Sequence, residues 1–317
     1  MLREKYGTWT ELAARLQELA PPVMELPEDQ ESIEKGLKRL AGRDNRPGDK
    51  YGRALLRCFG VPSSLRDWIR GLTQYHSRFA DLPLDNRHAH LMRYDCPPVS
   101  ESDCRIWIDV ALGSFAHRRG DHEVARQRLL CSRGGRQPTG DPAMYIERAL
   151  LEARIVSDSG DLDQESLLLQ EAAELIHADA LSEEDRICYR ARLVDQSAFR
   201  TARDRLPESI RQALTLYEEI DEYETHPFAL FRREHGRAWC LWKLGRHGDA
   251  IAAANRAIQS AGDGGYVRLR VQSLHLLSQI LGPGTVANKH RERALIMACT
   301  LGDPDLLKRF DSQEPES

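Results

Sequence analysis

The sequence predicts an all-α protein. Its apolar residues recur mostly three and four positions apart, which places them on one face of a helix. Gly and Pro stand between these runs, where they end helices and form turns. Runs of β-branched residues, which favour strands, are scarce. We expect a small helical domain over residues 1–96, a longer helical array over 97–310 and a flexible tail at 311–317.

The first two expected helices are marked by their ends. Thr8 and Glu11 form a capping box before the apolar positions of the first helix, which stops at Pro21. The second helix is expected over residues 28–41, where apolar residues again repeat at helical spacing, and Gly42 ends it.

Two more helices follow a turn-rich basic loop at residues 43–50. The first is expected over 50–59, with Gly60 closing it. The second is expected over 65–79, because a capping box begins at Ser64 and one apolar stripe runs through that range.

Charge is distributed unevenly along the chain. Residues 35–93 carry thirteen basic and five acidic side chains, a net charge of +8, whereas the whole chain has a net charge of −4. Residues 1–34 and 97–317 are acidic, at −5 and −6. A basic block inside an acidic protein points to an anionic partner.

Residues 51–69 resemble a helix-turn-helix domain, in which a Phe-Gly-Val turn separates two short helices. The apolar residues after the turn sit about one place early, and Pro62 is unusual there. Alternatively, helices at 10–19 and 28–41 form the pair, although eight residues between them exceed the usual turn. The resemblance implies DNA binding by cations that contact phosphates and a few base edges. The candidates are Lys35, Lys38, Arg39, Arg43, Arg46, Lys50, Arg53, Arg57, Arg66 and Arg70.

A repeated pattern of small residues marks the rest of the chain. Leu-Gly, a second Gly and an Ala recur at similar spacing in residues 111–125 and around Gly245, and a weaker copy surrounds Gly160. Small residues let two helices approach closely, and a Gly between them allows a tight turn. The period is near 40 residues, and further helices are expected at 207–220, 266–281, 286–301 and 306–310.

This pattern resembles the tetratricopeptide repeat (TPR) family, which implies an array of α-hairpins that binds a peptide or dimerises. Arg233 and Arg237 lie four residues apart, as a carboxylate-binding pair in such a groove requires. Alternatively, they pair with the acidic run at 218–224. Regulators with a helix-turn-helix and a TPR-like array often grip peptides with asparagines, but here only Asn255 and Asn288 lie in the array.

Catalytic and metal sites find little support in the sequence. The phosphate-binding, dinucleotide, hydrolase and zinc-protease motifs are absent, and paired carboxylates fit solvated helix faces. We expect no enzyme activity and no cofactor. His76, His88, His90 and Cys96 offer ligand types that suit zinc, but their spacing fits no known pattern and a solvated His pair is the simpler interpretation.

The sequence also predicts a cytoplasmic protein. It has neither an apolar N-terminal stretch of the signal-peptide kind nor a long uncharged run. Its seven cysteines include no Cys-x-x-Cys pair, as expected for free thiols in a reducing compartment. No membrane partner is expected.

Together these observations predict a non-enzymatic binding protein. The first hypothesis is a DNA-binding transcriptional regulator with a TPR-like effector or dimerisation domain, whose partners are DNA, a protein or peptide and a second copy of the chain. The alternative is a TPR-type interaction scaffold without nucleic-acid binding, in which the basic block docks an acidic partner or the array.

Overall fold

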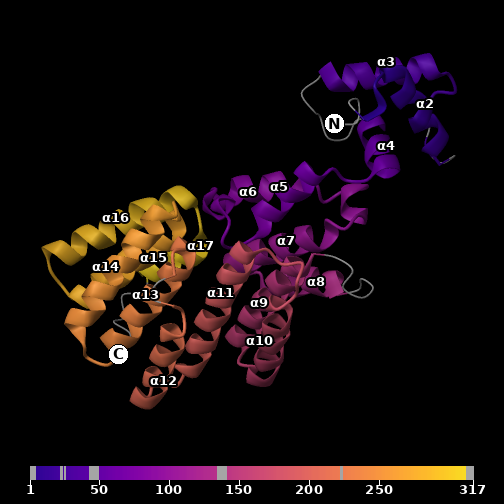
Figure 1. Cartoon of the computed structure of the whole chain (residues 1–317). Helices are drawn as coiled ribbons and strands as arrows, with labels where there is room; N and C mark the ends of the chain where they lie inside the picture. The colour runs from indigo at the N-terminus through magenta and orange to yellow at the C-terminus, as the bar shows by residue number, and fades with distance from the viewer. Residues whose placement is uncertain are drawn as a thin grey trace. The chain divides into compact units, whose positions relative to one another are not determined.

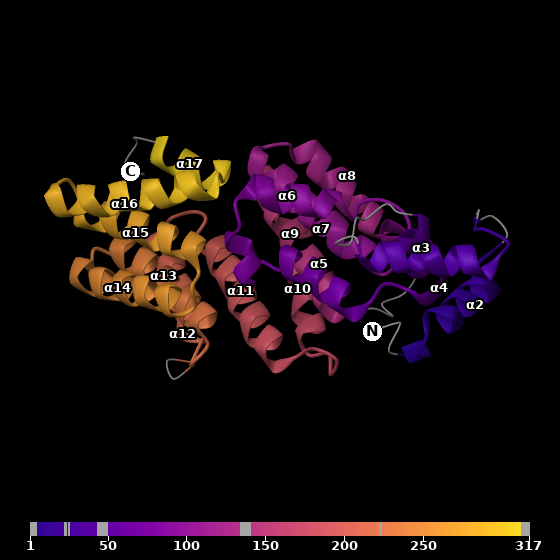
Figure 2. The ribbon, with the colours of Figure 1, turned by 90° about the horizontal axis from the view of Figure 1, so that it is seen from above.

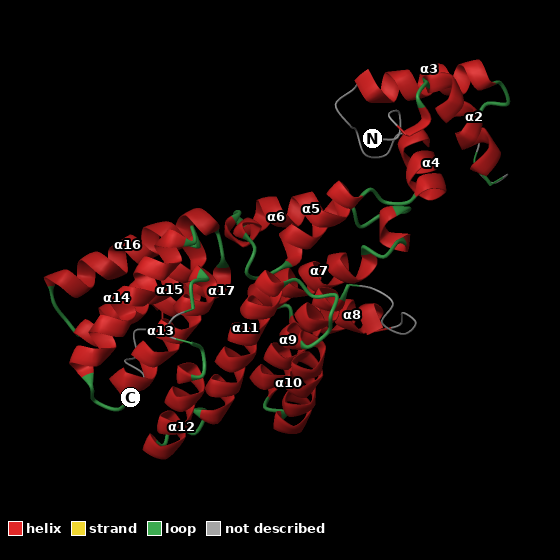
Figure 3. Cartoon of the chain, viewed as in Figure 1, coloured by secondary structure: helices red, strands yellow, loops and turns green. Residues whose placement is uncertain are grey.

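The structure is a computed structural model that describes residues 5–21, 24, 26–42, 50–133, 141–221 and 224–311. These residues form sixteen α-helices, α2 to α17, and two short 3-10 helices, with no strand among them (Figure 1, Figure 3). The predicted all-α class is confirmed. None of the described helices is both long enough and apolar enough to cross a membrane.

The chain divides into two compact units. The first comprises Met1–Arg70 and Ala89–Ile108, and the second comprises Gly71–His88 and Asp109–Ser317. Residues 71–88 therefore cluster with the array, although the sequence analysis assigned them to the N-terminal domain. The helices α5, α6 and α7 contribute residues to both units.

Three helices share the core of the first unit: α2 (Trp9–Leu19), α3 (Gln30–Gly42) and α4 (Lys50–Phe59). The predicted capping box begins α2, since Thr8 Oγ1 accepts a hydrogen bond of 3.1 Å from Glu11 N and Glu11 Oε2 accepts one of 3.1 Å from Thr8 N. Gly36 lets α3 approach α4, because a Cβ atom there would lie 2.1 Å from the Tyr51 ring. Leucine, isoleucine and alanine side chains fill the space between the three helices.

The next segment differs from the prediction. One helix was expected over residues 65–79, but α5 (Ser63–Thr73) ends early and a 3-10 helix, η1 (Arg78–Asp81), follows it. The backbone N–H of Tyr75 donates to Glu147 Oε1 at 3.1 Å instead of continuing α5. Contacts with distant residues therefore override the local apolar stripe. The segment continues into α6 (Leu84–Met92) and a second 3-10 helix, η2 (Val99–Glu101).

The second unit is an array of paired helices (Figure 2). It contains α7 (Arg105–Arg119), α8 (His122–Arg133), α9 (Pro142–Ser159), α10 (Leu162–Ile176), α11 (Glu183–Thr201), α12 (Pro207–Glu218), α13 (Pro227–Lys243), α14 (His247–Asp263), α15 (Val267–Leu281), α16 (Thr285–Leu301) and α17 (Pro304–Asp311). From α9 onward each odd-numbered helix up to α15 packs on the helix that follows it.

The turn glycines explain this pairing. Gly120, Gly160 and Gly245 have φ angles of +86°, +82° and +77°, which residues with side chains rarely adopt. The predicted turns at these glycines are confirmed. Alanines of α14 are fully buried in the core that α13 and α14 share, as expected for a close helix approach. The second unit is therefore compatible with a helical repeat.

Candidate functional site

One face of α4 is basic. Lys50, Arg53 and Arg57 lie at positions i, i+3 and i+7 of the helix, so they share one face, and all three side chains are exposed. Tyr51 and Ala54 are buried beside this face, against α2 and α3. The core therefore fixes which side of α4 faces solvent. This face of Lys50, Arg53 and Arg57 is called the α4 basic face below.

An acidic side chain adjoins this face. Arg57 Nη2 lies 3.4 Å from Glu101 Oε2, and both side chains remain exposed, so water screens the pair and its contribution to stability is small.

Three other predicted DNA-binding cations share one face of α3, at positions i, i+3 and i+4. On α3, Lys35 and Lys38 pair with Glu31 at 2.7 Å and with Glu34 at 2.5 Å, one turn earlier in the same helix, while Arg39 is exposed. Carboxylates thus offset two of the three cations on α3.

On α5 the two predicted cations point to local partners. Arg66 is exposed and its Nε atom donates to the Val61 carbonyl at 3.0 Å, whereas the Arg70 guanidinium lies 5.8 Å from the centre of the Trp107 ring. Arg43 and Arg46 lie outside the described residues. Of the ten candidates, α3 and α4 each bring three onto one face, and carboxylates offset two of those on α3 and one of those on α4.

The predicted carboxylate-binding pair on α13 is engaged within the array. Arg233 and Arg237 both contact Glu234, and Arg233 Nε also donates to the Ile220 carbonyl at 3.0 Å. Arg237 Nε lies 3.5 Å from Glu218 Oε1, in the acidic run that the sequence offered as the alternative partner.

The four weak zinc candidates do not converge. His76 packs against the Tyr189 ring and His88 against the Phe115 ring. In the other unit, His90 packs edge-on against Trp68, and Cys96 Sγ lies 3.4 Å from the Arg93 carbonyl oxygen. Across the described parts of the chain, no three His, Cys, Asp or Glu side chains are grouped as a metal site requires.

A cluster of buried arginines lies in the second unit, around residues 74–81. We call the segment of residues 74–81 the strap. The centre of the Tyr75 ring is 5.0 Å from the Arg192 guanidinium, 5.1 Å from that of Arg232 and 5.0 Å from that of Arg268. These arginines come from α11, α13 and α15, and each is more than nine-tenths buried. Guanidinium groups at this distance from an aromatic ring attract it, more strongly away from water.

Each arginine of the cluster also has a carboxylate partner. Arg192 pairs with Glu147 at 2.6 Å and Arg232 with Asp195 at 2.8 Å. Arg268 Nε lies 3.2 Å from Asp303 Oδ2, the atom that also lies 3.4 Å from Arg118 Nη1. Pairing of this kind makes buried arginines tolerable, because an unpaired buried charge is strongly destabilising.

The cluster changes the ionisation of Tyr75. Burial by itself would raise the pKa of its hydroxyl, but the charges of Arg268, Arg232 and Arg118 and a hydrogen bond from Arg232 lower the pKa to about 7. Tyr189 is fully buried, and there burial, reinforced by the charge of Glu147, raises the pKa well above its ordinary value. The difference lies in the arginines around Tyr75.

The strap is anchored on both sides of Tyr75. His76 Nε2 lies 3.2 Å from Asp185 Oδ1, and Gln74 Nε2 donates to the same oxygen at 2.8 Å. Six residues after Tyr75, the Asp81 carboxylate accepts from the backbone N–H groups of Val267 at 2.7 Å and Arg268 at 2.9 Å. Asp81 thus binds the N-terminus of α15, where free N–H groups and the helix dipole favour an anion.

Arg87 of α6 supports the strap from its other side. It is almost fully buried and donates to the carbonyls of Leu72 at 2.5 Å, Thr73 at 3.3 Å and Ala80 at 3.5 Å. One side chain thereby joins the chain segments that enter and leave the strap.

Sequence reasoning missed these arginines, although the chain carries a signal for them. Arg192, Arg232 and Arg268 are 40 and 36 residues apart, which is close to the repeat period, so they occupy related places in successive hairpins. The choice of Arg233 over its neighbour Arg232 selected the wrong face of α13 for this cluster.

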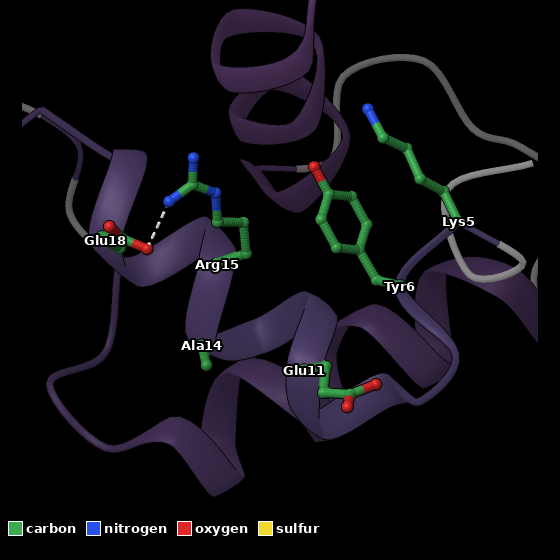
Figure 4. Close-up of a pocket in the computed structure, with 6 residues that line it drawn as sticks. All are labelled: Lys5, Tyr6, Glu11, Ala14, Arg15 and Glu18. Atoms are coloured by element: carbon green, nitrogen blue, oxygen red, sulfur yellow. Dashed lines mark hydrogen bonds and ion pairs between the residues drawn. The ribbon is translucent and has the colours of Figure 1, made fainter.

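A surface depression on the first unit has no comparable chemistry. Figure 4 shows its lining residues, Lys5, Tyr6, Glu11, Ala14, Arg15 and Glu18. Its charged groups are exposed, and Arg15 already pairs with Glu18 at 2.5 Å.

The chain was also compared with known proteins. No protein-family model matches it, and neither the curated proteins nor the solved structures yield a match.

Proposed function

We propose that this protein is a non-enzymatic DNA-binding regulator in which the first unit binds duplex DNA and the second is a TPR-like effector or dimerisation domain. The observation that carries the proposal is the α4 basic face, with Lys50, Arg53 and Arg57 exposed on a short helix that a three-helix core holds through Tyr51 and Ala54. Cations on one face of a rigid helix suit the phosphates along a DNA groove.

Packing within the first unit favours α4 as the reading helix. The sequence left open which helices form the helix-turn-helix pair. The hydrophobic core joins α4 to α2 and α3, and the residues of that core do not include α5. In this proposal α4 therefore belongs to a three-helix unit with α2 and α3 and does not pair with α5.

A salt titration of binding between the full-length protein and random duplex DNA tests the proposal. Displacement of counterions by three cations gives a slope of about −3 for log K against log salt concentration. Micromolar binding at low salt with a slope of this size or steeper is expected. Absence of binding at low salt would contradict DNA binding.

An interaction scaffold without DNA binding remains the second candidate. It is favoured by the carboxylates that offset Lys35, Lys38 and Arg57, since cations paired within the protein do not require a nucleic acid. The same titration separates the two functions, because a scaffold gives no salt-dependent DNA binding.

A further inference from the structure

The strap is held by the array in the way that a bound peptide is held. Its contacts with α11, α13 and α15 come from side chains at defined positions, with Tyr75 at one end and Asp81 six residues later. The 3-10 helix η1, four residues long, follows Tyr75 and ends at Asp81. The array thus holds several side chains of the strap, among them Tyr75 and Asp81, which are six residues apart.

We propose that the array face contacted by the strap is a peptide-binding site, which the strap occupies in cis and for which a partner peptide competes. The partner carries a tyrosine followed six residues later by an aspartate. This inference rests on the proposed function only in taking the second unit as the effector domain, and it names the ligand class of that domain.

The tyrosine end of the site selects an aromatic side chain with an acceptor oxygen. Three guanidinium groups surround the ring, and the charges of Arg268 and Arg232 act on its hydroxyl. An aliphatic side chain would leave these cations without their aromatic partner, and it would bury charge against an apolar group.

The aspartate end selects a carboxylate. Two backbone N–H groups of α15 point at Asp81, and α15 is a full helix of fifteen residues. An amide in place of the carboxylate would lose the attraction to the helix N-terminus.

The strap leaves part of this site unsatisfied. Arg232 Nε and Arg268 Nη1 are buried without a hydrogen-bond acceptor, and both side chains are more than nine-tenths buried. Buried donors of this kind are uncommon in folded proteins. A partner peptide that supplies another acceptor oxygen here gains hydrogen bonds that the strap does not make, so it can displace the strap.

The test uses the full-length chain with Tyr75→Ala and Asp81→Asn, which loosens both ends of the strap. A fluorescently labelled peptide of residues 71–83 is the probe, and its anisotropy reports binding. The double variant is expected to bind the peptide at least tenfold more tightly than the unmodified chain, whose site is occupied.

Two matched controls locate the binding. Adding Arg232→Gln and Arg268→Gln to the double variant should abolish peptide binding, and so should Tyr75→Ala within the peptide. Equal binding by the folded double variant and the unmodified chain, or by the altered peptide, would overturn the proposal.

Circular dichroism establishes that the double variant is folded. If it is not, Tyr75→Phe keeps the ring and loosens only the hydroxyl end. Tighter peptide binding by this variant than by the unmodified chain then supports the proposal, and equal affinity overturns it. No DNA is present in these measurements. A negative result would therefore contradict the peptide site without contradicting DNA binding.

Discussion

At the scale of single residues, Tyr75 shows how neighbours decide the chemistry of a partly buried group. Tyr75 is partly buried and Tyr189 fully buried, and burial favours the neutral phenol in each. Arginines reverse the balance only at Tyr75, and they lower its pKa to about 7. The phenolate of Tyr75 is therefore expected near neutral pH, well below the ordinary range for tyrosine.

The pH dependence of stability tests this expectation. The pKa of Tyr75 is about 7 in the folded chain and about 10 in the unfolded chain. Its ionisation therefore contributes fully to the free energy of unfolding above pH 10, and this contribution is lost as the pH falls through 7. Between pH 7 and pH 10, the difference in free energy of unfolding between the unmodified chain and Tyr75→Phe should rise by up to ~1.4 kcal/mol per pH unit. Urea unfolding of both proteins across this range measures the difference.

A direct optical measurement accompanies the unfolding curves. One of the nine tyrosines should ionise near pH 7 in the near-ultraviolet spectrum, and this transition should be missing from Tyr75→Phe. A difference in stability that stays constant from pH 7 to 10 would contradict the ionisation.

At the scale of elements, close helix approaches depend on individual glycines. Gly236 of α13 faces Tyr217 of α12, and a Cβ atom at Gly236 would lie 2.1 Å from the Tyr217 ring. The ring is also tethered, since the Tyr217 hydroxyl donates to Asp195 Oδ1 at 3.1 Å. It cannot move aside without breaking that hydrogen bond.

Gly236→Ala should therefore destabilise the array by about 1–3 kcal/mol, the usual effect of overpacking. Gly248→Ala is the matched control in α14, because no atom lies within 4 Å of the added Cβ, and it should stabilise by about 0.5–1 kcal/mol through helix propensity. Thermal unfolding compares the two variants. Equal effects of the two substitutions would show that the α12–α13 contact is looser than described.

Elements with local signals could be predicted from the sequence. The capping box at Thr8 and the turns at Gly120, Gly160 and Gly245 depend on a few neighbouring residues, and each is confirmed. The expected helix over 65–79 was wrong beyond Thr73, since the contacts that end it come from residues such as Glu147, far along the chain.

The two candidate sites also differ in how far the sequence predicts them. The α4 basic face follows from helical spacing alone, so the sequence contained it, although not the core that fixes its orientation. The arginine cluster depends on which face of α13 meets the strap. Periodicity places Arg232 and Arg233 equally well, and only the fold distinguishes them.

At the scale of the whole molecule, the two units are interleaved along the chain. Residues 71–88 belong to the second unit but lie between two stretches of the first. A cut at the predicted boundary after residue 96 would remove the strap, and with it Tyr75 and Arg87, from the array.

Two truncations test this interleaving. Removing residues 1–60 keeps the strap, and the array should unfold at nearly its original temperature. Removing residues 1–96 exposes Arg192, Arg232 and Arg268 and should cost about 4 kcal/mol or more, or about 10 °C in Tm for a unit of this size. Similar melting temperatures for the two truncated chains would contradict an integral strap.

The central claim is that the α4 basic face binds DNA, and a matched pair of charge reversals tests it most directly. Lys50→Glu with Arg53→Glu changes α4, and Lys35→Glu with Lys38→Glu makes the same charge change on α3. The salt dependence of duplex binding is measured for both and for the unmodified chain.

The α4 reversal should weaken binding by about a hundredfold or more and reduce the salt slope by about 2, since two phosphate contacts are lost. The α3 reversal should weaken binding by less than about tenfold, because only the overall charge changes. Equal losses from the two reversals, or no loss from the α4 reversal, would contradict DNA binding through α4.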